Sequence, residues 1–119
     1  MDISSLKNWD LKNVTSINSF LANAGKEKIE LDISKWDLTQ ITKASNAFYK
    51  ANISALKLTD ENGNRSENLY FTNLTDADGL ISETALEEFD SSLIPYSAPL
   101  KKINSIFYKC PNLKSLKIN

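Results

Sequence analysis

The residue types best suited to chemistry lie in the acidic segment Asp76-Ala77-Asp78-Gly79-Leu80-Ile81-Ser82-Glu83. Carboxylates spaced around a glycine resemble a calcium-binding loop, in which a turn glycine is flanked by oxygen ligands. With Gly79 as that glycine, the first ligand position falls on Leu74 and the closing glutamate position falls on Ala85. Neither side chain can hold a cation, so we expect an acidic turn before a short helix over Ser82–Phe89. A weak, adventitious Ca²⁺ contact is the alternative.

Catalytic candidates are scarce in the rest of the chain. The sequence has no histidine, which removes Ser-His and Cys-His nucleophile pairs and histidine-based zinc sites. The single cysteine, Cys110, cannot form an internal disulfide. Asp10 and Asp37 have no acid or base partner near them in sequence, and we expect each to accept hydrogen bonds from the backbone of its own turn. We therefore predict no enzyme, no cofactor and no metal ion.

Partner binding is indicated for residues 59–93. This segment has nine acids against Arg65, a net charge of -8, which leaves +7 for the rest of a chain whose total is -1. Asn62-Gly63 between two alternating segments predicts a hairpin. Such a segment favours a basic partner or the lysines of a neighbouring repeat, and a solvated acidic loop is the alternative. The candidate partner-binding residues are Tyr70, Phe71, Asp76, Asp78, Glu83 and Glu87.

An internal repeat positions these side chains. Trp9-Asp10-Leu11 recurs as Trp36-Asp37-Leu38, 27 positions later. After each tryptophan, apolar residues fall at relative positions 0, +3, +6, +7 and +10, and the spacing starts again at Leu100. This spacing is typical of one face of an α-helix, so we predict three helices. Their buried stripes are Val14, Ile17, Phe20, Leu21 and Ala24; Ile41, Ala44, Ala47, Phe48 and Ala51; and Leu100, Ile103, Ile106, Phe107 and Cys110.

A short alternating segment follows each predicted helix. Alternation of apolar and polar residues predicts a strand with one buried face, here near 29–33, 53–58 and 113–118. A unit of 27 residues cannot bury its apolar face alone. We therefore expect stacked copies, with a small parallel sheet on one wall and the helices on the other.

Ile33–Ala51, which reads ISKWDLTQITKASNAFYKA, resembles the BspA-like surface repeats of mycoplasmas and low-GC Gram-positive bacteria. The matching positions include Trp36, Phe48, Phe107 and Cys110. The resemblance implies an α/β fold, a short leucine-rich-repeat-like solenoid of helix-turn-strand units with an inserted hairpin and helix. It implies one domain over 1–119, as part of a longer array, with regular repeats at 1–58 and 94–119 and an enlarged or degenerate unit at 59–93.

The resemblance also implies the cell surface of a low-GC bacterium and a role in adhesion. We expect a non-catalytic surface repeat module that binds a protein partner or a host surface component; a structural stalk or spacer of a larger surface lipoprotein is the alternative. The net charge of -1 gives no attraction to nucleic acid, and no run approaches the roughly 18–20 apolar residues of a membrane span. Open ends of a stacked array predict end-to-end self-association. Structural roles are expected for Trp9, Trp36, Phe48, Phe107 and Cys110.

Overall fold

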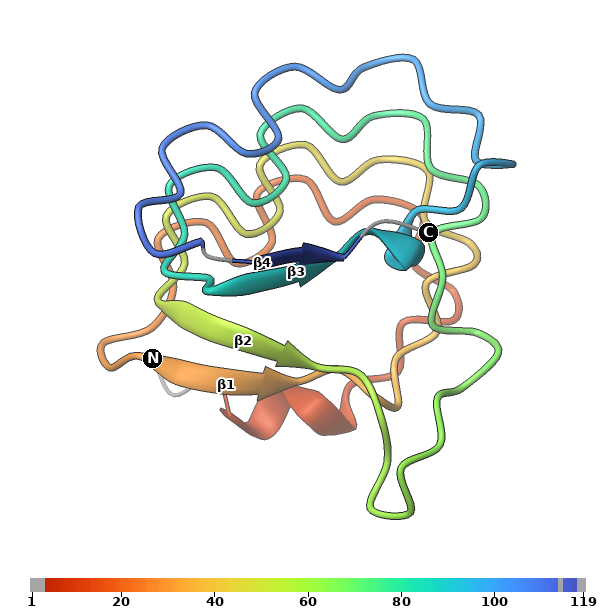
Figure 1. The fold of residues 1–119 in the computed structure, drawn as a ribbon. Helices are drawn as coiled ribbons and strands as arrows, with labels where there is room; N and C mark the ends of the chain where they lie inside the picture. The colour runs from red at the N-terminus through yellow and green to blue at the C-terminus, as the bar shows by residue number, and fades with distance from the viewer. Residues whose placement is uncertain (1–3, 114, 118–119) are drawn as a thin grey trace.

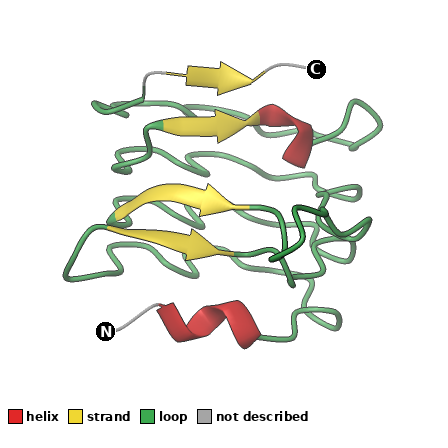
Figure 2. Cartoon of the chain, turned by 60° about the horizontal axis from the view of Figure 1, so that its bottom comes forward, coloured by secondary structure: helices red, strands yellow, loops and turns green. Residues whose placement is uncertain are grey.

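Short parallel strands form one wall of the protein, whose computed structural model describes residues 4–113 and 115–117 (Figure 1). The strands pair in two separate two-stranded parallel sheets, and a short 3-10 helix lies beside the first strand, at the end of the molecule opposite the last (Figure 2). The expected strand residue Ile118 lies outside the described part of the chain. The elements are η1 (Ser4–Asn8), β1 (Ile29–Asp32), β2 (Ile53–Lys57), β3 (Glu88–Asp90), η2 (Ser91–Leu93) and β4 (Ser115–Lys117).

Four stacked segments form the opposite wall. Parallel bridges join Ser16 to Lys43, Lys43 to Asp76, and Asp76 to Lys102. The four segments therefore run side by side in the same direction, as the wavy traces at the top of Figure 1 show. We call them turn layers 1 to 4, and they comprise residues 14–24, 41–51, 74–84 and 100–110.

The turn layers are not helices, so the predicted helix-turn-strand solenoid with a helical wall is wrong. No α-helix occurs in residues 4–113 or 115–117. Each layer has two residues with positive φ, four positions apart, and a left-handed residue cannot continue the α-helical hydrogen-bond pattern. The chain makes successive tight turns instead: in layer 1, the N–H of Phe20 donates to the carbonyl of Ile17 at 3.0 Å. The positive-φ residues are Ser19, Asn23, Asn46, Lys50, Gly79, Glu83, Ser105 and Lys109.

Hydrogen bonds between layers take the N–H groups that the turns do not use. The N–H groups of Ile17, Ser19 and Leu21 donate to carbonyls of layer 2 at 2.8, 2.9 and 2.8 Å. A threonine column ties the layers in the other direction, because the hydroxyl of Thr75 donates to the carbonyl of Thr42 at 2.9 Å. Where two layers face each other, the backbone of each is therefore largely satisfied by the other, as buried backbone must be.

The apolar stripes point inward although they are not helical. In layer 2, Ile41 and Ala44 are 0% exposed and Phe48 is 4% exposed. Tight turns that follow one another every three or four residues bring side chains back to the same face at nearly the interval of an α-helix. The apolar spacing therefore identifies the buried and partly buried side chains of layers 1 and 2, but in layer 4 Ile103 and Phe107 are 56% and 42% exposed. The spacing leaves the backbone conformation undetermined.

Turn layer 3 lies within the enlarged unit, 59–93, and the expected helix at its end is absent because the chain there finishes the layer and enters β3. Thr75 lies 33 positions after its partner Thr42, whereas Thr42 lies 27 after its partner Thr15. The additional length of six residues is taken up by an exposed loop before the layer. The inward positions of layer 3 repeat the stripe of the other layers, with Leu74, Ala77, Leu80, Ile81 and Thr84 all buried.

The loop is the hairpin expected at Asn62-Gly63, and we call residues 59–65 the hairpin. An antiparallel bridge joins Thr59 to Arg65, and the N–H of Asp60 donates to the carbonyl of Asn64 at 2.8 Å. Gly63 has φ +79°, a conformation that suits glycine at a hairpin tip. The hairpin projects from the body of the molecule beside β2 (Figure 1).

Candidate binding surfaces

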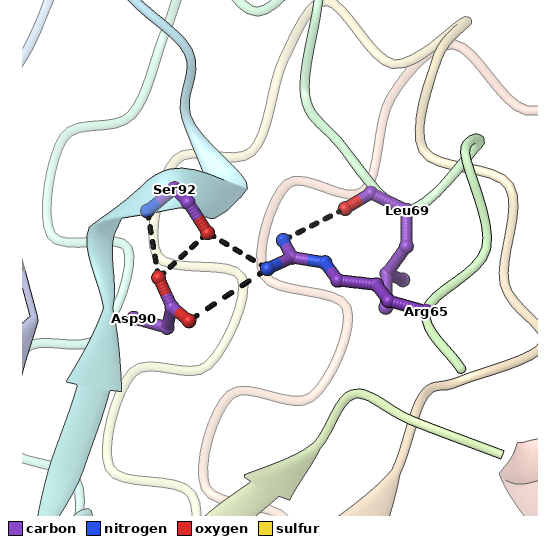
Figure 3. A network of polar contacts seen from close by, with 4 residues as sticks. All are labelled: Arg65, Leu69, Asp90 and Ser92. Atoms are coloured by element: carbon purple, nitrogen blue, oxygen red, sulfur yellow. Dashed lines mark hydrogen bonds and ion pairs between the residues drawn. The ribbon is translucent and has the colours of Figure 1, made fainter. Parts of the chain in front are cut away.

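Arg65 anchors the base of the hairpin to β3 and η2 (Figure 3). Its guanidinium donates to the hydroxyl of Ser92 at 2.7 Å and to the carbonyl of Leu69 at 3.2 Å. It lies 3.7 Å from the carboxylate of Asp90 and stacks over the ring of Tyr70, 4.3 Å from its centroid. Asp90 in turn accepts from the N–H and hydroxyl of Ser92 at 2.9 and 2.6 Å. The hairpin is therefore held in one orientation at its base.

A first cavity, of about 350 Å³, lies between β2 and β3, where the two sheets part. Apolar side chains such as Leu56, Leu58 and Phe89 line it together with Arg65 and acidic residues of β3. The guanidinium at its rim is already occupied by Asp90 and Ser92. This cavity thus belongs to the anchor of the hairpin.

A second cavity, of about 690 Å³, is an open groove across all four turn layers, and we call it the turn-face groove. Its walls are hydroxyls, amides, carboxylates and two phenol rings, contributed by the same relative positions of successive layers. Its lining residues are Ser19, Ala22, Asn23, Asn46, Tyr49, Asp78, Gly79, Ser82, Glu83, Asn104, Ser105 and Tyr108.

Hydrogen bonds fix part of this lining and leave part available. The carboxylate of Asp78 accepts from the N–H of Asn104 at 2.7 Å, and the hydroxyl of Ser82 donates to the carbonyl of Tyr108 at 3.1 Å. Within the described chain, the side-chain amides of Asn46 and Asn104 have no hydrogen-bond partner. The groove therefore has a fixed frame with polar groups that can bind a ligand.

The six candidate partner-binding residues do not form one surface. Asp78 and Glu83 line the turn-face groove. Tyr70 packs against Arg65 at the hairpin base, and Phe71 is a core residue, 3% exposed. Asp76 forms the parallel bridges of layer 3. Glu87 is exposed between layer 3 and β3, and its backbone N–H donates to the carbonyl of Ser54.

Of the groove residues, only Asp78 and Glu83 were predicted, and those not predicted include Asn46, Tyr49, Asn104 and Tyr108. A signal for the two tyrosines does exist, because both hold relative position +8 of their layers. The apolar stripe of each layer comprises positions 0, +3, +6, +7 and +10, so it does not include the two rings.

The residues given structural roles divide between the core and the ends of the stack. Trp36 is 1% exposed, and its indole N–H donates to the carbonyl of Leu6 at 2.9 Å. Phe48 is buried in layer 2, while Trp9 is 46% and Phe107 42% exposed in the outer layers. The thiol of Cys110 is partly buried and contacts the carbonyl of Ile81 at 3.1 Å.

The two tryptophans do not stack on each other. The ring of Phe20 lies between them, with its centroid 5.2 Å from that of Trp9 and 6.1 Å from that of Trp36. Trp9 is therefore the outer member of an aromatic cluster at the first layer, and half of its surface faces solvent.

The aspartates that follow the tryptophans act in turns, as expected. Asp10 accepts from the N–H of Lys12 at 3.0 Å, and Asp37 accepts from the N–H of Thr39 at 2.9 Å. Asp32 forms the same motif with Ser34 at 2.9 Å. Burial opposes ionisation of Asp32, but the hydrogen bonds from Ser34 and the charges of Lys57 and Lys7 outweigh it and hold its pKa below the ordinary 3.8.

In 4–113 and 115–117, no three metal-ligating side chains gather in one place. No helix in this part of the chain has the length and apolar character to cross a membrane.

Residues 2–82 match the family described as "Mycoplasma protein of unknown function, DUF285". No curated protein and no solved structure matches the chain significantly.

Proposed function

Since the chain belongs to DUF285, a family of mycoplasma proteins of unknown function, we propose that it is a non-catalytic binding module of a mycoplasma surface protein. Its recognition element is the hairpin, residues 59–65. The partner is a protein or other component of a host surface with a basic binding face.

The observation that carries this proposal is the insertion itself. The hydrogen-bonded threonines of layers 1, 2 and 3 are separated by 27 and then 33 positions, and the extra length is the hairpin. Turn layers use their backbone for stacking, whereas the hairpin adds nothing to the stack. Insertions in repeat proteins commonly lie on the binding face.

The chemistry of the hairpin favours a basic partner. Glu61 at the tip and Glu67 just beyond the base are exposed. The carboxylate of Asp60 is turned inward, where it accepts from the N–H groups of Asn62 and Asn64, both at 2.9 Å. Arg65 holds the base, so the exposed acids are presented with little ordering cost on binding.

Binding of fluorescently labelled protein to cultured epithelial cells tests the proposal. One variant replaces residues 60–64 by two glycines and keeps Thr59 and Arg65; a second carries Glu61→Lys. We expect saturable binding by the wild type that weakens with added salt, and about a tenfold loss in both variants.

Glu27→Lys is the matched control, because Glu27 is equally exposed, lies away from the hairpin and gives the same change in net charge. It should bind like the wild type. The proposal would be contradicted if the wild type showed no saturable binding, or if a folded variant without the hairpin bound fully. The second result is the one expected of a structural stalk or spacer. An equal loss of binding in Glu27→Lys would show that binding depends on the net charge of the protein and not on the hairpin, and would also contradict the proposal.

A further inference from the structure

We propose that the turn-face groove is a second binding site, and that its ligand is a neutral carbohydrate chain. The site is separate from the hairpin and does not depend on the function proposed for it. It is built from residues of all four turn layers, so it exists only when the layers are stacked.

The polar lining matches the hydrogen-bonding needs of a sugar. Each hydroxyl of a sugar both donates and accepts, and a primary amide or a carboxylate beside an amide can serve two neighbouring hydroxyls. The amides of Asn46 and Asn104 are unoccupied by described residues, and Glu83 lines the same groove. These groups come from layers 2, 3 and 4, so several sugar units would be contacted at once.

Two tyrosine rings supply the apolar part of the site. Tyr49 and Tyr108 lie in the groove at the same relative position of layers 2 and 4, and Tyr108 is 53% exposed. The ammonium groups of Lys50 and Lys109 lie 5.2 and 5.3 Å from the respective ring centroids. Each ring is thereby steadied by its neighbour, and its exposed surface can pack against the C–H face of a sugar.

The charge of the groove favours a neutral ligand. Two carboxylates, Asp78 and Glu83, line it, and the two ammonium groups of Lys50 and Lys109 balance them at its rim. The two carboxylates would repel a polyanion, and the two ammonium groups would repel a lysine-rich peptide. Neither charged ligand therefore finds a surface that carries only the opposite charge.

The backbone shapes the floor of the groove. Gly79 has φ +63°, and a Cβ at this position would overlap the side-chain amide of Asn46. The glycine therefore gives that amide its place on the floor. Stacked strands and layers repeat at about 4.8 Å, so a groove across four layers spans roughly 14 Å. That length suits a short chain of sugars better than a single one.

Amide-shift NMR titration of the whole chain tests the proposal. The probes are tetrasaccharides of glucose, mannose, galactose and N-acetylglucosamine, each added separately. We expect at least one to give saturable shifts confined to the groove residues. Tyr108→Ala should weaken that binding by about tenfold, the contribution of one aromatic contact.

Three controls distinguish sugar binding in the groove from binding elsewhere on the chain and from binding by charge. Tyr96→Ala removes a tyrosine that is 94% exposed and outside the groove, so it should leave affinity unchanged. The variant without the hairpin should also bind normally, which keeps this test independent of the surface-binding assay. No saturable shifts with any sugar, equal losses in both tyrosine variants, or tighter binding of a heparin fragment or a lysine peptide would overturn the proposal.

Discussion

The left-handed residues of the turn layers are mostly of types that do not favour that conformation. Asn23, Asn46 and Gly79 are ordinary choices for positive φ, but Lys50 and Lys109 are not. A left-handed conformation costs a residue with a side chain about 1–2 kcal/mol. Here the hydrogen bonds between layers offset that cost. Because the hydrogen-bond partners in the neighbouring layer lie 25 or more positions away, local sequence could not reveal these turns.

Gly79→Ala tests the requirement for a glycine in layer 3. The new side chain would impose left-handed strain and displace Asn46, so we expect a loss of about 2 kcal/mol in the free energy of unfolding. Gly63→Ala is the control, because its φ is +79° but nothing lies within 4 Å of its new Cβ. It should cost about 1 kcal/mol. Equal losses in urea unfolding would show that Asn46 is not held in place by the glycine.

Trp36→Ala tests the packing of the core between the two walls. The indole is 1% exposed and hydrogen-bonded to Leu6, so we expect a loss of about 3–5 kcal/mol. Trp9→Ala, at a tryptophan that is 46% exposed, should cost about 1 kcal/mol. Denaturant unfolding of both variants measures the difference, and a loss below about 1 kcal/mol for Trp36→Ala would place that side chain outside the core.

At the scale of elements, the sequence predicts the inward positions of layers 1 and 2 and the hairpin, but not the backbone conformation of the layers. Turn layers 1, 2 and 4 were recognised by their apolar spacing. Layer 3 was missed because it begins 33 rather than 27 positions after layer 2, and because Leu69 and Tyr70 stand where the copies of layers 1 and 2 have the Trp-Asp pair. Of the turn-face groove, only Asp78 and Glu83 were predicted, since its remaining residues become neighbours only through stacking.

Arg65→Lys tests the attachment of the hairpin to β3 and η2. Lysine keeps the charge but cannot bind Ser92, Asp90 and Leu69 together, so we expect a loss of about 1–2 kcal/mol in stability. A double-mutant cycle with Ser92→Ala isolates the contact. The two losses should be non-additive by about 0.5 kcal/mol or more. Additive losses would mean that the contact does not stabilise the protein.

At the scale of the whole molecule, the outer edges of layers 1 and 4 are complementary. In layer 4, four backbone N–H groups stand at the positions from which layers 1 and 2 donate to the next layer, and no other described residue accepts from them. They belong to Ile103, Ser105, Phe107 and Lys109. Ile103 and Phe107 are also 56% and 42% exposed. At the outer edge of layer 1, four backbone carbonyls accept no hydrogen bond from a described residue, whereas the corresponding carbonyls of layers 2 and 3 accept from the preceding layer. The carbonyls are those of Ser16, Asn18, Phe20 and Ala22.

This complementarity predicts weak head-to-tail self-association. It remains weak because β4 of one copy and η1 of the next would compete for the same place in the shared layer. Sedimentation should detect dimers only at high concentration, and Ile103→Glu should abolish them by placing a charge in the interface. Lys12→Gln, at an exposed residue outside both edge rows, is the control, because it gives the same change of -1 in net charge. A strictly monomeric wild type would contradict this prediction.

Both proposed sites depend on stacked turns in residues 14–24, 41–51, 74–84 and 100–110, the same segments whose spacing otherwise indicates helices. Far-ultraviolet circular dichroism of the whole chain distinguishes the two conformations directly. We predict a spectrum without the double minimum of α-helices, lost in one cooperative transition on heating. A helical spectrum strong enough for four such segments would contradict the stacked layers and both binding sites built on them.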